Sequence, residues 1–260
     1  MGTPDQYMYR IGDSAPFSIF SAYNIVGTVG CFCWFLAYGF MIAKSHEDKA
    51  NGLPVLALCL NFGWEFLGSF VWANPIPLWR WFYRIWFFLD VAIFAQVWLY
   101  GKRMQSVPEV RRYFHPILIG TLVLGTFGQW AFTRTFYDPL GFITAFGINL
   151  VMSQRFIALY FERPDLRGLS YAAAWFKMLG TLCTSFECYY FLPVIHPSKP
   201  SFAFAHFLFV SIFLLDVAYI GLLHRARQRL AREQRSKLPS EGQPSRAQPF
   251  SAGAPAMLAD

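Results

Sequence analysis

Residues 81–101 read WFYRIWFFLDVAIFAQVWLYG, an apolar run that is interrupted by two charged residues, Arg84 and Asp90. A helix needs about 20 predominantly apolar residues to cross the hydrocarbon core of a bilayer. The strands of a membrane barrel alternate apolar and polar side chains, whereas the apolar residues here are consecutive. This stretch therefore predicts a transmembrane α-helix.

Six further apolar stretches flank this run. The seven predicted membrane-spanning helices are Phe17–Ala43, Leu53–Ala73, Trp81–Gly101, Phe114–Phe136, Pro139–Phe161, Ser170–Pro193 and Ser201–Leu223. The composition agrees, because 55% of the residues are hydrophobic and 14% are charged, against about 25% charged residues in soluble domains. We expect an all-α polytopic membrane protein with a seven-helix domain over residues 1–223, followed by a basic juxtamembrane segment and a disordered tail over residues 224–260.

Basic residues are unevenly divided between the two ends of the predicted bundle. One end carries Lys44, Lys49, Lys102, Arg103, Arg111, Arg112, Arg163, Arg167 and the arginines that follow residue 224. The other end carries Arg10, Arg80, Arg84, Arg134 and Lys199. Because cytoplasmic loops are enriched in Lys and Arg, we expect the C-terminus in the cytoplasm and the N-terminus outside. The net charge of +7 then faces anionic lipid, and no nucleic-acid partner is expected.

A few ionisable side chains lie deep within the predicted spans. They are Glu65, Asp90, Arg155, Lys177, Glu187 and Asp216. A charge in hydrocarbon is costly, so each of these residues is a functional candidate by default. The structural alternative is that Asp90 or Glu187 pairs with Arg155 or Lys177 and holds helices together.

Glu65 has the clearest local setting. Asn61, Glu65, Gly68 and Ser69 are three or four residues apart, so they share one face of the second predicted helix. The small residues leave room for a neighbouring helix or for a ligand. Trp64 lies beside this stripe, and the sequence therefore predicts a polar site with an aromatic wall.

The combination of deep acids with many aromatic rings indicates carbocation chemistry. Desolvation penalises the carboxylate anion, so a buried carboxyl group favours its protonated form and can act as a general acid. Aromatic faces stabilise cations by about 0.5–2 kcal/mol each, and a dry site keeps water from quenching the cation. The rings expected to face a cation are Trp34, Trp64, Trp86, Phe213 and Tyr219. Asn61, Glu187 and Arg155 are the other expected binding residues.

Three features of the chain resemble the small membrane-bound terpene cyclases, the paxilline-type enzymes of fungal meroterpenoid and indole-diterpene pathways and their actinobacterial relatives. Trp64 and Glu65 adjoin in the second predicted helix after Asn61, a lone Asp216 lies in the seventh, and residues 86–90 read WFFLD. The similarity covers about residues 17–223.

The resemblance implies that a prenylated aromatic substrate is cyclised after protonation of a terminal alkene or epoxide. The product is an isomer, made without a cofactor, a metal ion or loss of diphosphate. Two acids essential in the family match Glu65 and Asp216. We expect one of them to donate the proton, while the other, or Asp90, stabilises the donor's anion or relays its proton. The Ala-, Arg- and Pro-rich tail is typical of a high-GC bacterium, and in that branch the expected substrate is a farnesylated indole. The identity of the donor and of the protonated group stays open.

Two other classes of protein fit some of these features. Intramembrane acids also serve proton-coupled transporters, although no internal repeat is visible in the chain. A retinal protein needs a Schiff-base lysine in its last helix, and no Lys lies between Ser201 and Leu223. The cyclase interpretation explains more of the observed residues than either alternative.

Overall fold

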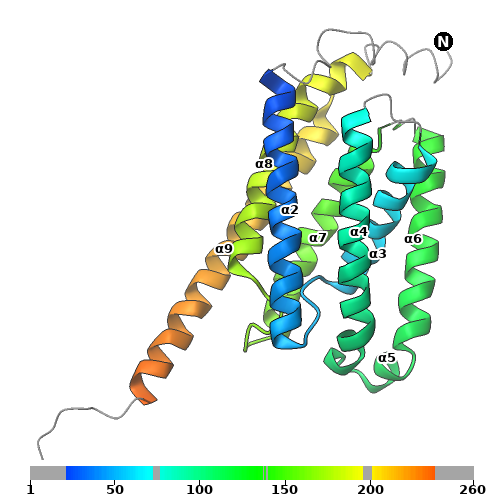
Figure 1. Cartoon of the computed structure of the whole chain (residues 1–260). Coiled ribbons are helices and arrows are strands. Elements are labelled where there is room, and N and C mark those ends of the chain that lie inside the picture. The colour runs from blue at the N-terminus through cyan, green and yellow to red at the C-terminus, as the bar shows by residue number, and fades with distance from the viewer. Residues whose placement is uncertain (1–21, 73–76, 137, 139, 196–200, 238–260) are drawn as a thin grey trace, which may run out of the picture. The chain divides into compact units, whose positions relative to one another are not determined.

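The computed structural model describes residues 22–72, 77–136, 138, 140–195 and 201–237. All regular secondary structure within these ranges is helical, which confirms the predicted all-α class (Figure 1). The long helices are α2 (Ala22–Asp48), α3 (Val55–Phe66), α4 (Pro77–Tyr100), α6 (Phe114–Phe136), α7 (Phe142–Glu162), α8 (Tyr171–Ile195) and α9 (Ala203–Lys237). The short elements are the π-helix η2 (Leu67–Val71), the 3-10 helix η3 (Gly101–Met104) and α5 (Pro108–Arg112).

Five helices of the described chain are long and apolar enough to cross a membrane. These spans are Asn24–Asp48, Trp79–Met104, Phe114–Phe136, Phe142–Glu162 and Ala203–Glu233. The segment of α3 and η2, Val55–Val71, is apolar but shorter. α8 is long enough but contains Lys177, Glu187 and several hydroxyl side chains. An integral membrane protein is therefore supported, while the exact number of seven spans remains a prediction.

Two helices continue beyond the apolar runs that predicted them. α2 ends at Asp48 rather than at Ala43, and its last turn is supported by ion pairs from Lys44 to Glu47 and Asp48 at 3.3 and 3.0 Å. α9 continues past Leu223 into an arginine-rich stretch. Hydropathy marks where an apolar run ends, whereas a helix can extend further on polar side chains. The start of the first predicted span, residues 17–21, lies outside the described residues, as does the part of the predicted tail from residue 238 onward. The part of that tail up to Lys237 is helical, because α9 continues through it.

The chain divides after His224 into two units, and the packing of the first unit builds the candidate site. Within this unit α2 packs along α8, and α3 packs against α4, α6 and α7 (Figure 1). Glycines permit the closest approach, because a Cβ atom on Gly30 of α2 would lie only 3.0 Å from the carbonyl oxygen of Gly180 on α8. Small residues at such crossings are typical of membrane helix interfaces.

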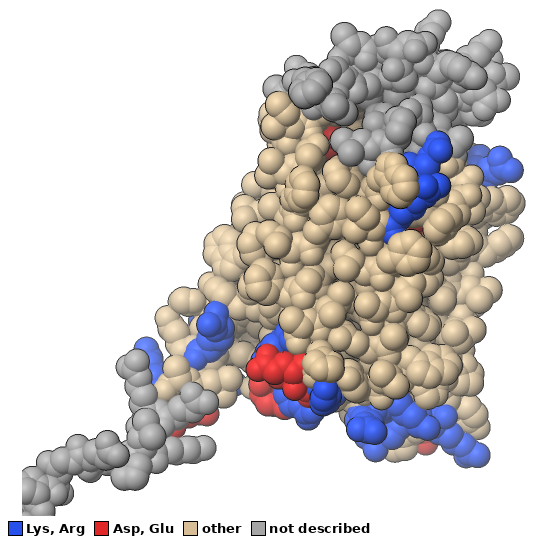
Figure 2. All heavy atoms as spheres, viewed as in Figure 1, with Lys and Arg blue, Asp and Glu red and all other residues tan. Residues whose placement is uncertain are grey.

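Charged residues of this unit concentrate near the ends of the helices. On the face shown in Figure 2, a broad band of uncharged residues separates the Lys and Arg residues near the two ends. The end formed by η3, α5 and the connection from α7 to α8 carries Lys102, Arg103, Arg111, Arg112 and Arg167. A belt of this kind is expected where lipid tails surround a protein.

At this basic end, Arg163 ties two loops together. Its guanidinium donates hydrogen bonds to the backbone oxygen of Asn51 at 2.5 Å and to the side-chain oxygen of Asn51 at 2.6 Å. The backbone nitrogen of Gly168 donates to Asp48 at 2.6 Å in the same region. The end of α7 is thus fixed to the loop between α2 and α3, which carry two walls of the candidate site.

Replacing Arg163 by Ala should lower the stability of the bundle. Arg163 is only 5% exposed, and its loss leaves the Asn51 oxygens without their donor, which costs about 1–3 kcal/mol. Thermal unfolding of the detergent-solubilised protein measures this as a lower midpoint. Arg103→Ala, at an exposed position, is the matched control and should leave the midpoint unchanged. Equal midpoints for both variants would contradict the assigned role of Arg163.

Candidate functional site

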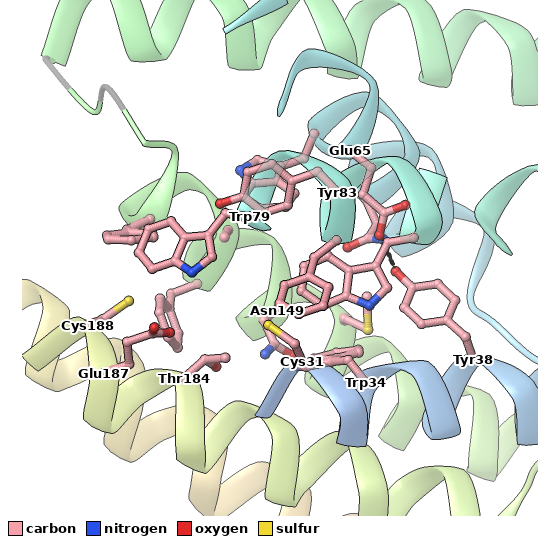
Figure 3. A pocket seen from close by; sticks show the side chains of 18 residues that line it. Cys31, Trp34, Tyr38, Glu65, Trp79, Tyr83, Asn149, Thr184, Glu187 and Cys188 are labelled. Atoms are coloured by element: carbon pink, nitrogen blue, oxygen red, sulfur yellow. Dashed lines mark hydrogen bonds between the residues drawn. The ribbon is translucent and has the colours of Figure 1, made fainter. Parts of the chain in front are cut away.

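A cavity lined mainly by aromatic side chains lies between α2, α3, α4, α7 and α8 (Figure 3). Its empty volume, including its open mouth, is about 850 Å³, which is within the range of small-molecule sites. The aromatic lining residues are Trp34, Tyr38, Trp64, Trp79, Phe82, Tyr83, Trp86, Phe142 and Phe146. The other polar lining residues are Asn61, Glu65, Asn149, Thr184 and Glu187.

Glu65 and Asp90 form a buried acid pair that is bridged by Asn61. Glu65 is 2% exposed and Asp90 is fully buried. The amide nitrogen of Asn61 lies 2.9 Å from Oε1 of Glu65 and 2.8 Å from Oδ2 of Asp90. One amide nitrogen therefore contacts both carboxyl groups. Oε2 of Glu65 and Oδ1 of Asp90 are buried and receive no hydrogen bond from a fixed donor among the described residues.

Tyr38 of α2 completes this cluster. Its hydroxyl group donates to Oε1 of Glu65 at 2.5 Å, and it also lies 2.5 Å from the amide nitrogen of Asn61 (Figure 3). The spacing of Asn61 and Glu65 on α3 places both on one face, as their separation of four residues predicts. One oxygen of Glu65 therefore has two donors, and the other remains free to hold a proton.

The orientation of Trp64 in the cavity wall depends on Gly141. The indole nitrogen of Trp64 donates to the carbonyl oxygen of Gly141 at 2.9 Å. Gly141 has φ of +68°, a left-handed conformation that favours glycine. A Cβ atom at this position would also lie 2.7 Å from the rings of Trp64 and Trp72. Glycine is thus required both for the backbone conformation and for the space of the two indoles.

Asp216, by contrast, forms an ion pair away from the main cavity. Lys177 Nζ lies 2.8 and 2.9 Å from the two carboxylate oxygens of Asp216, and Oγ of Ser153 lies 2.8 Å from Oδ1. The side chains of Lys177 and Asp216 are each 3% exposed. The nitrogen of Lys177 is also 5.8 Å from the ring centroid of Trp34, which lines the main cavity. Lys177, a predicted partner of Asp90 or Glu187, is therefore paired with Asp216 instead.

The structure brings together part of the predicted site. Asn61, Trp34, Trp64 and Trp86 line the same cavity as Glu65, and Asp90 adjoins it through Asn61. Glu187 lines this cavity too, but Figure 3 shows it at the end opposite Glu65.

Three predicted residues lie elsewhere. Phe213 lines a second cavity between α8 and α9, together with Asp216. Tyr219 stacks on Phe156 with ring centroids 5.2 Å apart, outside the main cavity. The side chain of Arg155 is 46% exposed and lies 3.7 Å from Glu162. Chemical type alone predicted these residues, whereas the rotation of each helix determines which side chains face the cavity.

Several lining residues were not predicted from the sequence. Tyr38, Trp79, Tyr83, Phe142 and Phe146 belong to this group. Tyr38 follows Trp34 by one helical turn, which is the only sequence signal that could have identified it. Its contact with Glu65 joins residues 27 positions apart, so no local spacing predicts the hydrogen bond.

The described residues contain no group of three or more His, Cys, Asp or Glu side chains arranged to hold a metal ion. The five cysteines are free, and two of them, Cys31 and Cys188, line the main cavity. The polar groups that line the cavity are thus carboxyl, amide and hydroxyl groups together with these two thiols.

Replacing either partner of the Lys177–Asp216 pair should destabilise the protein strongly, because the other charge is left buried and unpaired. Asp216→Asn and Lys177→Met should each cost about 3–5 kcal/mol, whereas the double variant should recover most of this loss. Thermal unfolding of all four proteins in detergent measures the coupling. Additive losses in the double variant would show that the two charges do not depend on each other.

Similarity to known proteins points to one family. The family model of the Pyr4-like transmembrane terpene cyclases matches residues 13–229. The Pyr4-family terpene cyclase mfmH of Annulohypoxylon moriforme is 27% identical over 58% of this chain and 63% of its own length, so the match covers less than two thirds of that relative. Terpene cyclase pyr4 of Aspergillus fumigatus is 26% identical over 78% of this chain and 86% of its own.

Terpene cyclase macJ of Penicillium terrestre is 24% identical over 73% of this chain and 76% of its own length. No solved structure matches the chain. The family match extends from before the start of α2 to beyond the apolar part of α9, and thus includes every wall of the aromatic cavity. The chain belongs to the Pyr4-like transmembrane terpene cyclases.

Proposed function

We propose that this protein cyclises a prenylated aromatic substrate, of the farnesylated indole type, by protonating its terminal alkene or epoxide. The observation that carries the proposal is the buried Glu65–Asp90 pair on the wall of an aromatic cavity. Terpene cyclases are the named relatives of the chain, which favours this function over proton-coupled transport. The enzyme acts within the bilayer, with its C-terminus in the cytoplasm.

The Glu65–Asp90 pair is the proposed proton donor. Two adjacent buried carboxyl groups cannot both ionise without strong repulsion, so the pair retains a proton. Because the two sites titrate together, the proton belongs to the pair rather than to one residue. Glu65 itself lines the cavity, so the proton reaches the substrate from its carboxyl group while Asp90 lies behind it.

Tyr38 and Asn61 make this donor a stronger acid. Both donate to Oε1 of Glu65, and a hydrogen bond to a carboxylate stabilises the anion that remains after proton transfer. An alkene is a weak base, so its protonation depends on this stabilisation more than the opening of an epoxide does. The arrangement supports a mechanism that starts at either group.

The rings of the cavity stabilise the cations that follow. Trp34, Trp64, Trp79 and Trp86 present aromatic surface to the same space, and each ring contributes about 0.5–2 kcal/mol when water is absent. Asp216 has a supporting role, because it neutralises Lys177, whose charge lies close to Trp34. An unpaired ammonium group at this distance would repel a carbocation in the cavity.

Glu65→Gln should abolish cyclisation. The amide keeps the shape of the side chain but supplies no proton of comparable acidity, so turnover should fall by about 10²–10⁴-fold. Membranes that contain the protein are supplied with farnesylated indoles carrying a terminal alkene or epoxide, and mass spectrometry detects a product of unchanged mass and altered retention. Asp90→Asn should also lose most activity.

Glu162→Gln is the matched control for this assay, because it removes an exposed carboxyl group from α7 and should leave turnover unchanged. If Glu65→Gln retained the activity of the wild type, the Glu65–Asp90 pair could not be the donor. If the folded wild type converted neither class of substrate, the proposed reaction itself would be wrong.

Tyr38→Phe should slow proton transfer without weakening substrate binding. The variant removes one hydrogen bond to the anion of Glu65 and leaves the ring in place, so kcat should fall about 10-fold while KM changes little. The loss should be greater for an alkene substrate than for the matching epoxide. Steady-state kinetics on both substrates measure the difference, and an equal effect on kcat for both would argue against a role in acidity.

A further inference from the structure

We infer that Glu187 is the base that removes a proton from the last carbocation of the cyclisation. Its position also determines which end of the substrate lies at each end of the cavity. This inference rests on the proposed cyclase function. Glu187 lies on α8 at the end of the cavity opposite Glu65, with Trp79, Tyr83 and Cys31 between the two carboxyl groups (Figure 3).

Within the part of the chain that the structure describes, no ion pair accounts for the carboxyl group of Glu187. The residue is 5% exposed, and its Oε1 atom is buried without a hydrogen-bond partner among the described residues. The Lys and Arg residues that form ion pairs in the described chain contact other acids. A buried carboxyl group without such partners costs stability, so an apolar side chain would pack better at this position.

The neighbouring helix leaves space for this carboxyl group. A Cβ atom on Gly27 of α2 would overlap the carboxyl atoms of Glu187, so only glycine permits the observed position. The other titratable groups near Glu187 among the described residues are the thiols of Cys31, Cys183 and Cys188 and the hydroxyl group of Tyr83. Glu187 is the only carboxyl group among these, and burial without a hydrogen-bond donor to Oε1 makes its anion a strong base for the final deprotonation.

The reaction balances with one acid and one base. The Glu65–Asp90 pair transfers a proton to the terminal alkene, whose π electrons form the new C–H bond and leave a tertiary cation. Internal alkenes attack in turn and move the cation along the chain. A carboxylate oxygen of Glu187 then takes a proton from the carbon beside the last cation, and the electrons of that C–H bond form the final C=C bond. The product is an isomer of the substrate, and exchange with water in the empty cavity resets both acids.

The two ends of the cavity thus recognise different ends of the substrate. The terminal isoprene unit must lie at Glu65, where protonation begins. The last ring closes on the isoprene unit nearest the aromatic group, so that unit must lie near Glu187. Proton transfer leaves an anion at the Glu65–Asp90 pair. Because the base lies at the opposite end of the cavity, this anion stays far from the last carbocation.

Glu187→Gln tests this role through the products rather than through activity alone. Initial protonation does not involve Glu187, so substrate consumption should stay within about threefold of the wild type. The wild-type alkene should fall at least about fivefold as a share of all products, in favour of other double-bond isomers and of an alcohol formed by water capture. Glu187→Asp should restore part of the wild-type share. Products are quantified by chromatography with mass spectrometry.

Two further variants control for indirect effects. Gly27→Ala keeps the carboxyl group but displaces it, so it should shift the product ratio in the same direction as Glu187→Gln. Ser185→Ala removes a hydroxyl group from the same helix outside the main cavity and should leave the ratio unchanged. A wild type without activity would refute the proposed function. If the wild type is active and Glu187→Gln gives the same product ratio, the role of Glu187 is refuted while the cyclase function stands. If Glu187→Gln does not fold, an unchanged ratio in Gly27→Ala leads to the same conclusion.

Discussion

The amide of Asn61 holds two carboxyl groups together in a region where water cannot solvate them. Its nitrogen contacts Glu65, Asp90 and Tyr38, and so joins α3 to α4 and α2 at one point. In a low-dielectric interior such a network is rigid when its donors are satisfied. This cluster adjoins the aromatic cavity, because Tyr38, Asn61 and Glu65 are themselves lining residues. The polar cluster therefore sets both the chemistry and the position of the proposed site.

Two buried acid systems in the same bundle have opposite character. Asp216 is fully paired, with Lys177 and Ser153 occupying its oxygens. Glu65 and Asp90 each retain an oxygen without a fixed donor. An acid that is already neutralised by an ammonium group is a poor proton donor, whereas a pair of carboxyl groups can release one proton and remain hydrogen-bonded. The environment of each acid, rather than its residue type, distinguishes their proposed roles.

The helices and the pairing of Asn61 with Glu65 could be predicted from the sequence, because both depend on residues that are close together in the chain. The apolar run at residues 114–136 coincides with α6, and Asn61 and Glu65 share a face of α3 as expected. Contacts between helices follow no such spacing. The pair Lys177–Asp216 joins residues 39 positions apart, and Asp216 lies outside the cavity that Glu65 lines. Only the rotation of each helix, set by packing, decides which rings face the cavity.

The position of the Lys177–Asp216 pair also bears on how the protein enters the membrane. α8 carries an ammonium group that hydrocarbon would reject if the helix were inserted alone. Its counter-charge is on α9, the next helix along the chain, so these two helices are the smallest unit in which Lys177 is neutralised. Placing α8 and α9 in the bilayer together therefore avoids exposing an unpaired ammonium group to lipid tails.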